Sequence, residues 1–356
     1  MIAASPRVKL AGYALSLGMP LLAPLGVLAN APWLAPLIVF GAFPVLGLVI
    51  GEDRSLPLAG LQRSRLAVAY LDWLPRLYAF VWIAALLWAA GYAARGIGTG
   101  ELIWLIVATG IGGAVAICTA HELMHRRSPP DVLLGRAMSI LCCYGHMYVE
   151  HLHHHATMGD VAAGETAPRG SSIYRFAPSD FLKGLRNAWG VERARLWRIH
   201  APWWRNRVLQ DYTAAAAVGL ALGSLGGGAV LLFLGQALFA VFCFEVITYV
   251  HHYGLVRGGD EEPGARHAWA HHCWITNCLT FNNTFHSDHH LRPGTPYYEL
   301  HAMHGAPRLP ASYFTMFCIA LMPPLWRRLM HPRLDAWEDT ASVGELSAEL
   351  AAQRCR

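Results

Sequence analysis

Apolar stretches long enough to cross a lipid bilayer are the feature that most limits how this chain can fold. They cover about residues 10–29, 32–50, 77–95, 101–120, 211–227 and 229–250. A helix needs about 20 mostly apolar residues to cross the hydrocarbon core, where unpaired backbone groups find no water, so each stretch predicts one spanning helix. The expected fold is an all-α integral membrane protein with six transmembrane helices.

The composition supports a membrane-embedded chain rather than several soluble domains. Of the 356 residues, 54% are hydrophobic and only 14% are charged, whereas soluble domains carry about 25% charged residues. Residues 131–149 are also largely apolar, but Arg136 and His146 favour a helix that is re-entrant or buried against protein. We therefore expect one membrane domain over residues 1–337 and a polar C-terminal tail over residues 338–356.

Basic residues are distributed unevenly between the predicted connections. Arginines gather in the connections 51–76 and 121–210, while the connections 30–31 and 226–228 contain no lysine or arginine. Because lysine and arginine collect on cytoplasmic loops, this pattern places the N-terminus and both long connections in the cytoplasm. The net charge of +5 has the same explanation, and no basic patch with interleaved aromatic residues indicates nucleic-acid binding.

Histidines form four clusters, and the predicted topology brings all of them to the cytoplasmic side. The clusters contain His121 and His125, then His151 to His155, then His251 and His252, and finally His286, His289 and His290. Histidines four positions apart share one face of a helix. Neutral imidazole suits iron, zinc and copper, and one ion accepts far fewer ligands than these clusters supply. The pattern therefore predicts a histidine-rich cytoplasmic cap that holds more than one metal ion.

Two other interpretations use fewer of these residues. The segment from His121 to His125 matches the HExxH motif of zinc proteases, in which Glu122 would be the general base, but that interpretation leaves three clusters without a role. A metal transporter with a histidine relay would carry ionisable residues within its spans, and here Glu245, near the sixth apolar stretch, is the main example.

The clusters resemble the histidine boxes of the integral-membrane alkane 1-monooxygenases, which are kin of xylene monooxygenases and membrane fatty-acid desaturases. The segment His121–Arg126 is similar to HELxHK, Glu150–His155 to a shortened EHxxGHH, Tyr249–Leu255 to NYxEHYGL, and His286–His290 to the end of RHSDHH. Flanking residues agree as well, including Gly51-Glu52-Asp53, Thr276-Asn277 and Pro323-Pro324. Box order and separation both hold over about residues 32–337.

The resemblance implies a pair of non-heme irons and an O2-dependent hydroxylase of the bacterial inner membrane, which converts the terminal methyl group of an n-alkane or alkyl chain to a primary alcohol. An aromatic-methyl hydroxylase or a fatty-acyl desaturase would use the same site. The implied iron ligands are His121, His125, His151, His154, His155, His252, His286, His289 and His290. Because the second box is short and rich in histidine, His153 could replace His154. In the third box, His251 stands where the family has glutamate, and Thr248 where it has asparagine.

Carboxylates close to these histidines are candidates for orienting an imidazole by accepting its second N–H group. The candidates are Glu122, Glu150 and Asp288. An alkane offers no polar handle, so its binding depends on burial in an apolar channel. Possible channel walls are Trp33, Phe40, Phe43, Trp82 and Trp88.

Electrons must come from a separate protein, because the eight cysteines contain no CxxC pair that could form a rubredoxin-like centre. A rubredoxin or ferredoxin docked on the cytoplasmic face is the expected donor. Arginines that could attract an acidic carrier are Arg193, Arg195, Arg198, Arg205 and Arg207. The positive-inside bias alone would also explain these arginines.

Overall fold

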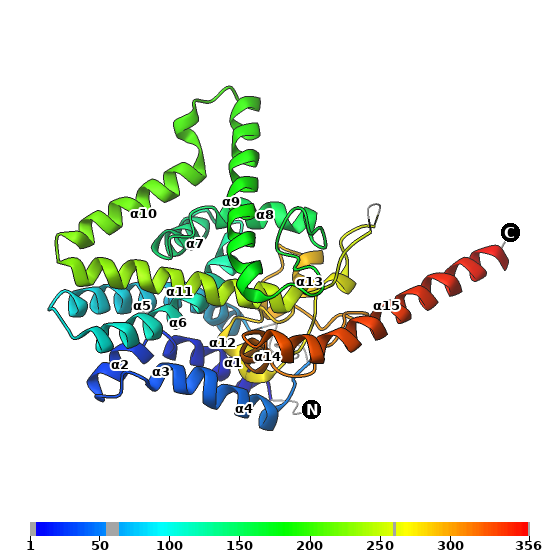
Figure 1. The fold of residues 1–356 in the computed structure, drawn as a ribbon, viewed down its shortest axis with the longest axis horizontal. Coiled ribbons are helices and arrows are strands. Elements are labelled where there is room, and N and C mark those ends of the chain that lie inside the picture. Colours follow the sequence, from blue (N-terminus) through cyan, green and yellow to red (C-terminus); the bar gives the residue numbers. More distant parts are fainter. Residues whose placement is uncertain (1–4, 55–63, 259–260, 355–356) are drawn as a thin grey trace.

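The structure is a computed structural model that describes residues 5–54, 64–258 and 261–354 (Figure 1). Within these ranges the regular elements are helices, and β-structure is limited to two isolated bridges, Glu52 with Cys273 and Ala270 with Arg308. The prediction of an all-α fold is therefore confirmed for the described part of the chain.

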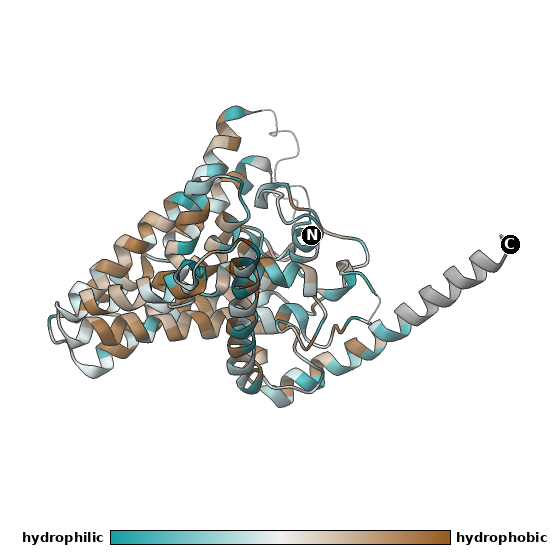
Figure 2. Ribbon diagram, turned by 90° about the horizontal axis from the view of Figure 1, so that it is seen from above, coloured by the Kyte–Doolittle hydropathy of each residue, from teal (hydrophilic) through white to brown (hydrophobic). Residues whose placement is uncertain are grey.

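In the described ranges, three helices are long and apolar enough to cross a membrane. They are α5 (Arg65–Ala93), α6 (Thr99–Met124) and α11 (Gly227–His252). Figure 2 shows apolar residues concentrated on the long helices at one end of the molecule and polar residues gathered around the other end. This separation is the pattern expected of an integral membrane protein with a polar cap.

Other apolar stretches fold into shorter or broken helices. The first stretch contains α1 (Pro6–Tyr13), η1 (Ala14–Gly18) and α2 (Leu22–Leu28), and it bends by 61° near Pro20, which lacks a backbone N–H group for a continuous helix. The second contains α3 (Leu34–Pro36), η2 (Leu37–Ala42) and α4 (Phe43–Ile50). With the bent pair counted as one, up to four helical segments of the described ranges qualify as spans by length and composition. Six spans thus remain a prediction.

Helices α6 and α11 pack closely through small residues. A Cβ atom at Gly113 would lie 2.8 Å from the Cβ of Ala240, and one at Gly110 would lie 2.9 Å from the Phe239 ring. Small residues allow helix backbones to approach one another in membranes. The result is a tightly packed helix pair whose C-terminal ends carry two of the four histidine clusters.

Both helices of this pair run toward the same end of the molecule. Helix α6 starts beside the end of α5, and Gly228, at the start of α11, lies against Ala93 at the end of α5. Because α6 and α11 start together, His121 and His252 lie together at their C-terminal ends.

The remaining helices lie around the helix pair or extend from it, and α10 joins the start of α11 at the end opposite the histidines (Figure 1). Helices α9 and α10 form a hairpin that projects from the body, and α15 runs outward to the C-terminus. The full set of remaining helices is α7 (Pro129–Leu141), α8 (Met147–Thr157), α9 (Ile173–Arg198), η3 (Trp203–Arg205), α10 (Arg207–Gly223), η4 (Ala265–His267), α12 (Trp274–Leu279), α13 (His286–Leu291), η5 (Tyr297–Glu299), α14 (Tyr313–Ala320) and α15 (Pro323–Arg354).

Candidate metal centre

Nine histidines from four helices converge into two groups, each of which could hold a metal ion. The first group contains His121, His125, His151, His155 and His289, and the second contains His154, His252, His286 and His290. Within each group the nitrogen atoms available for binding all lie within 4.8 Å of one another. These are the nine histidines that the sequence singled out, and we call the two groups the five-histidine cage and the four-histidine cage.

The five-histidine cage contains three nitrogen atoms that point toward one another. Nε2 of His125 lies 2.8 Å from Nε2 of His151 and 3.1 Å from Nε2 of His155, and the last two are 2.9 Å apart. Each Nε2 of a neutral imidazole carries one hydrogen or one lone pair, so hydrogen bonds cannot satisfy all three contacts of the triangle. Three lone pairs directed at a shared cation would give this arrangement.

The four-histidine cage contains two nitrogen–nitrogen contacts of similar length. Nε2 of His286 lies 3.0 Å from Nε2 of His252 and 2.9 Å from Nε2 of His290. Nδ1 of His252 lies 2.9 Å from the backbone oxygen of His267. This contact holds the hydrogen on Nδ1, so that Nε2 presents its lone pair to the cage.

The histidines outside the spanning helices are held in their neutral form. Burial, with a further contribution from His155, lowers the pKa of His125 to about 3. Burial likewise lowers the pKa of His154 to about 3 and that of His155 to about 4. Neutral imidazole is the form that binds metal ions, so these residues need not lose a proton before they bind.

Buried nitrogen atoms without partners provide a separate test of whether a metal fits. Among the described residues, Nε2 of His121 and Nε2 of His289 are buried and have no hydrogen-bond partner. Buried polar atoms are almost always paired. Both residues belong to the five-histidine cage, and a cation there would satisfy them, so the donor set fits a metal ion.

One residue near the metal centre, Glu165, escaped prediction from the sequence. Its Oε2 atom lies 3.0 Å from Nε2 of His154, and burial raises the pKa of Glu165 to about 8. Glu165 follows Gly164 in a turn, and both residues have positive φ angles, of 54° and 107°. No spacing rule relates a turn residue to a histidine on the preceding helix, so the sequence gives no signal for this contact.

The three carboxylates that the sequence suggested make contacts with other groups. Glu122 pairs with Arg126 on the next turn of the chain. Asp288 accepts two hydrogen bonds from Arg292 and one from the backbone N–H of His301. Glu150 is buried and is hydrogen-bonded to Glu165. Of the three, only Glu150 is linked to a cage histidine by these contacts, because its partner Glu165 contacts His154.

Two histidines adjacent to cage members lie outside both cages. His153 is only half-buried, whereas its neighbour His154 is buried in the four-histidine cage. The ring of His251 stacks on His286, with centroids 4.1 Å apart and planes inclined by 10°. His251 also lines the cavity described next.

An apolar cavity lies along α6 and α11. On α6 its wall includes Ile111, Val115 and Cys118, which precede His121 by ten, six and three positions. On α11 it includes Cys243, Ile247 and His251, and His251 precedes His252. The cavity therefore lies along the two helices that carry His121 and His252, and it reaches His251, the neighbour of His252.

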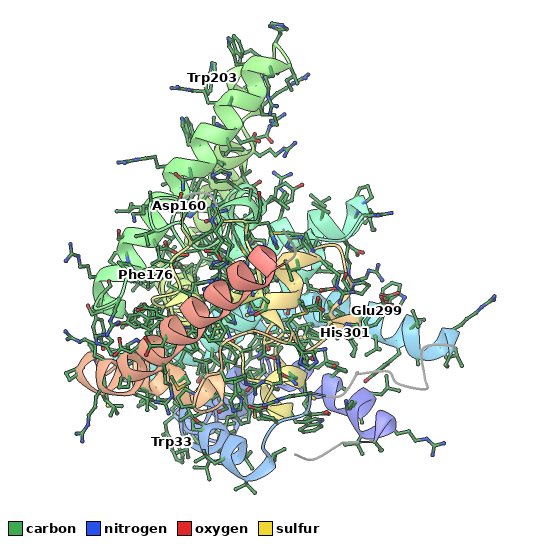
Figure 3. The ribbon with its side chains drawn as sticks, turned by 90° about the vertical axis from the view of Figure 1, so that its right-hand side faces the viewer. Trp33, Asp160, Phe176, Trp203, Glu299 and His301 are labelled. Atoms are coloured by element: carbon green, nitrogen blue, oxygen red, sulfur yellow. The ribbon has the colours of Figure 1, made fainter. Side chains whose placement is uncertain are left out.

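The aromatic residues suggested as channel walls occupy different environments. Phe40 lines the cavity, and Phe43 packs against Phe314, another lining residue, with ring centroids 5.0 Å apart. Trp82 is only 1% exposed and lies in the hydrophobic core. Trp33 and Trp88 are 48% and 37% exposed, and Figure 3 shows Trp33 at the outer edge of the molecule. The walls that the sequence analysis did not name come mostly from α6 and α11, from residues 276–284 and from α14.

Comparisons with known proteins agree with this architecture. Residues 100–320 match the family model described as fatty acid desaturase. The chain is 32% identical over 322 residues to alkane 1-monooxygenase 2 of Alcanivorax borkumensis, covering 86% of this chain and 83% of that protein. It is 35% identical to alkane 1-monooxygenase 1 of Pseudomonas aeruginosa, covering 84% and 82%.

A xylene monooxygenase is also similar to this chain. The hydroxylase component of the xylene/toluene monooxygenase of Pseudomonas putida is 31% identical, over 71% of this chain and 69% of that protein. The matched residues of the family model, 100–320, include all nine cage histidines. This integral membrane protein therefore belongs to the alkane 1-monooxygenase family, within the fatty acid desaturase group, and is an oxygenase-type oxidoreductase.

Proposed function

We propose that this protein is a di-iron monooxygenase that hydroxylates the terminal methyl group of an n-alkane or alkyl chain to a primary alcohol. The reaction consumes R–CH3, O2, two electrons and two protons, and it releases R–CH2OH and water. The observation that carries this proposal is an apolar cavity that reaches His251, beside two adjacent imidazole cages.

The cages are the proposed iron sites. His121, His125, His151, His155 and His289 would hold one iron, and His154, His252, His286 and His290 would hold the other. Nitrogen donors of this kind also suit zinc and copper, and the family resemblance favours iron. Bound iron would supply the activation of O2 and the oxidation of the C–H bond, which no amino-acid side chain provides.

The side chains of the cavity bind and orient the substrate. Burial of an alkyl chain contributes roughly 0.8 kcal/mol for each CH2 group, and the wall formed by Ile111, Val115 and Ile247 offers such burial. The chain must lie along α6 and α11, so its leading methyl group faces the histidine-bearing end of these helices. Selectivity for the terminal carbon follows from this alignment.

Seven of the nine cage histidines are buried, and His125 and His155 are partly exposed. His121, His252, His286 and His289 are among the buried ones, and the His267 carbonyl fixes the orientation of His252. Burial of this kind holds ligand nitrogens in place and limits the access of water to a reactive centre.

Electrons would arrive from a rubredoxin or ferredoxin bound at the cap. Arg195 and Arg207 are tied to the buried carboxylate of Glu192, whereas Arg193, Arg198 and Arg205 are exposed. The exposed arginines are the better candidates for contact with an acidic carrier.

The proposed location is the bacterial inner membrane, with six spans and with the cages on the cytoplasmic side. The arginine distribution of the sequence supports this orientation, and the common end at which α6 and α11 terminate supports one side for both cages. Residues 1–4, and with them the very N-terminus, lie outside the described residues.

The decisive experiment is anaerobic loading of the purified protein with ferrous iron, followed by turnover with a series of n-alkanes and a rubredoxin system. We expect two irons per chain and primary alcohols as products. p-Xylene and an acyl substrate belong in the same assay, because the similarity to a xylene monooxygenase favours aromatic methyl groups as a second substrate class. A single zinc ion bound by His121 and His125, with peptide hydrolysis, would instead support the protease interpretation.

A further inference from the structure

The apolar cavity contains a small number of polar side chains that alkane binding does not require. Apart from Tyr313, whose hydroxyl donates to the backbone oxygen of Trp269, they come from α11, α12 and the segment that follows α12, and they are His251, Thr276, Thr280, Asn283 and Thr284. A wall built only to hold a hydrocarbon would contain no hydrogen-bonding groups, because leaving them unpaired against an apolar ligand is unfavourable. The hydrogen-bond partners of these polar side chains therefore decide whether they have a role in ligand binding.

Three of these residues have partners within the protein. Thr280 Oγ1 donates to the backbone oxygen of Thr276 at 2.8 Å, and Thr284 Oγ1 donates to Asn277 Oδ1. Asn283 Nδ2 contacts Cys118 Sγ at 3.9 Å. These contacts give the three side chains a structural role that needs no ligand.

The other two residues, His251 and Thr276, do not have such partners. Nε2 of His251 and Oγ1 of Thr276 are buried atoms for which the described part of the chain provides no hydrogen-bond partner. Both side chains belong to residues that are only 3% exposed. Buried polar atoms are nearly always paired, with protein, water or a ligand, and the cavity is the space that these two residues line. We call them the polar pair.

The position of His251 relates the polar pair to the cages. Its ring stacks on His286, with centroids 4.1 Å apart, and lies 4.8 Å from the ring of Tyr313. His251 contributes to neither cage within the described residues. A group that is hydrogen-bonded to His251 would therefore lie next to the four-histidine cage without replacing one of its ligands.

We propose that His251 and Thr276 form a hydrogen-bonding subsite for a hydroxyl or carbonyl oxygen carried by the substrate chain. The protein would then prefer an oxygenated hydrocarbon to a plain alkane of the same shape. This inference rests on the proposed function, because it takes the cavity to be the substrate site. A hydroxyl group both donates and accepts, so it can pair with His251 Nε2 in either tautomer and with the threonine hydroxyl.

Binding of an isosteric pair of ligands tests the proposal. Undecane and 1-decanol differ by a methyl group in place of a hydroxyl group. The full-length protein in lipid nanodiscs is equilibrated with each radiolabelled compound, without O2 or an electron donor, and the label retained by empty nanodiscs is subtracted. We expect 1-decanol to bind about tenfold more tightly than undecane, the effect of about one hydrogen bond made in a buried site.

Matched substitutions assign the preference to the polar pair. His251→Phe keeps an aromatic ring against His286 and removes the nitrogen atoms, and Thr276→Val keeps the shape and removes the hydroxyl. Both should abolish the preference for 1-decanol, whereas His251→Gln and Thr276→Ser should retain most of it. The metal content of each variant, measured in parallel, shows whether the cages are intact, and Thr276→Val decides the question if His251→Phe does not fold.

The outcomes also separate this proposal from the proposed function. Equal binding of the two ligands by the unaltered protein, as expected if water satisfies the polar pair, would overturn the subsite, as would a preference that survives both His251→Phe and Thr276→Val. Hydroxylation of undecane by the iron-loaded protein would leave the proposed function standing in that case. A preference for 1-decanol in a protein that oxidises neither ligand would support the subsite and contradict the proposed function.

Discussion

His154 and His155 are consecutive residues of helix α8, yet they belong to different cages. Their ring centroids are 6.3 Å apart, and the ring planes are inclined by 58°. Successive side chains of a helix point about 100° apart, so neighbouring residues can face two adjacent sites. Helix α8 therefore forms part of the wall between the cages, and α13 does the same through His289 and His290.

This arrangement predicts that single substitutions on α8 remove different metal ions. His155→Ala should weaken binding in the five-histidine cage, and His154→Ala should weaken binding in the four-histidine cage. Because each residue would be a direct ligand, the loss should exceed the roughly 10–100-fold effect of residues that only support a ligand. Iron per chain, measured by mass spectrometry after buffer exchange, should fall from two toward one in either variant.

His153→Ala is the matched control, since His153 lies between the same neighbours and belongs to neither cage. It should keep both ions. Full iron occupancy in His154→Ala, or a loss in His153→Ala, would contradict the assignment of His154 to the four-histidine cage.

Glu165 should support the four-histidine cage through His154. Glu165→Gln keeps the size of the side chain and removes its capacity to carry a negative charge 3.0 Å from His154 Nε2. We expect the affinity of one of the two ions to fall by about 10–100-fold, as measured by competition with a chelator of known affinity. Glu299→Gln, at an exposed position of η5 (Figure 3), should leave both affinities unchanged. Equal chelator profiles for Glu165→Gln and the unaltered protein would show that the contact has no influence on the metal.

The ion pair between Glu52 and Arg308 should make stability depend on pH in the acidic range. Burial alone would raise the pKa of Glu52, but hydrogen bonds from Arg308 and Arg54 lower it to about 2. A carboxylate whose pKa is lowered by folding stabilises the protein above its unfolded pKa, which is about 4.3, and loses this contribution as the pH falls toward 2.

Glu52→Gln should therefore lower the unfolding temperature by a few degrees at pH 7, which corresponds to about 1 kcal/mol for a partly exposed pair. The difference between the two proteins should shrink progressively below about pH 4. Thermal unfolding in detergent at a series of pH values measures it. A difference that grows as the pH falls would exclude the ion pair as its cause.

Narrowing the cavity should shorten the longest alkyl chain that the protein accepts. Val115→Phe places a larger side chain in the wall formed by α6. Each methylene excluded from the cavity costs about 0.8 kcal/mol, or about fourfold in affinity. The product profile from a mixture of n-alkanes of increasing length should shift toward shorter chains.

Ile103→Phe tests whether this shift is specific. Ile103 lies on the same helix but is exposed, away from the cavity. Its substitution should leave the product profile unchanged. The same shift in both variants would indicate a general effect on α6 rather than a change in the substrate site.

The fold class follows from the apolar stretches of the chain, and the expected ligand set follows from the resemblance of its histidine clusters to the boxes of the family. Apolar stretches predicted helices over α5, α6 and α11, because a chain that crosses a bilayer must satisfy its backbone hydrogen bonds internally. Histidines spaced by three or four positions predicted faces rich in imidazole, because that spacing equals one turn of a helix. The nine histidines named from the boxes are the nine that the structure gathers.

Other expectations depended on information that is not local. Of the five aromatic residues suggested as channel walls, Phe40 lines the cavity, whereas Trp33 and Trp88 are exposed on the outside. An apolar residue in a membrane helix can face lipid, core or cavity with the same composition, so hydropathy does not distinguish these positions. The bend near Pro20 likewise divides an apolar stretch whose composition predicted one continuous helix.

The sequence by itself determined that this protein is helical, membrane-embedded and equipped with four clusters of histidine at metal-binding spacing, because periodicity and hydrophobicity are properties of short segments. Only the tertiary structure decided how those imidazoles divide into five and four, that Glu165 reaches His154, and that His251 faces the cavity while His252 joins a cage. Each of these features depends on how helices from distant parts of the chain are oriented when they pack against one another. A local sequence pattern does not determine that orientation.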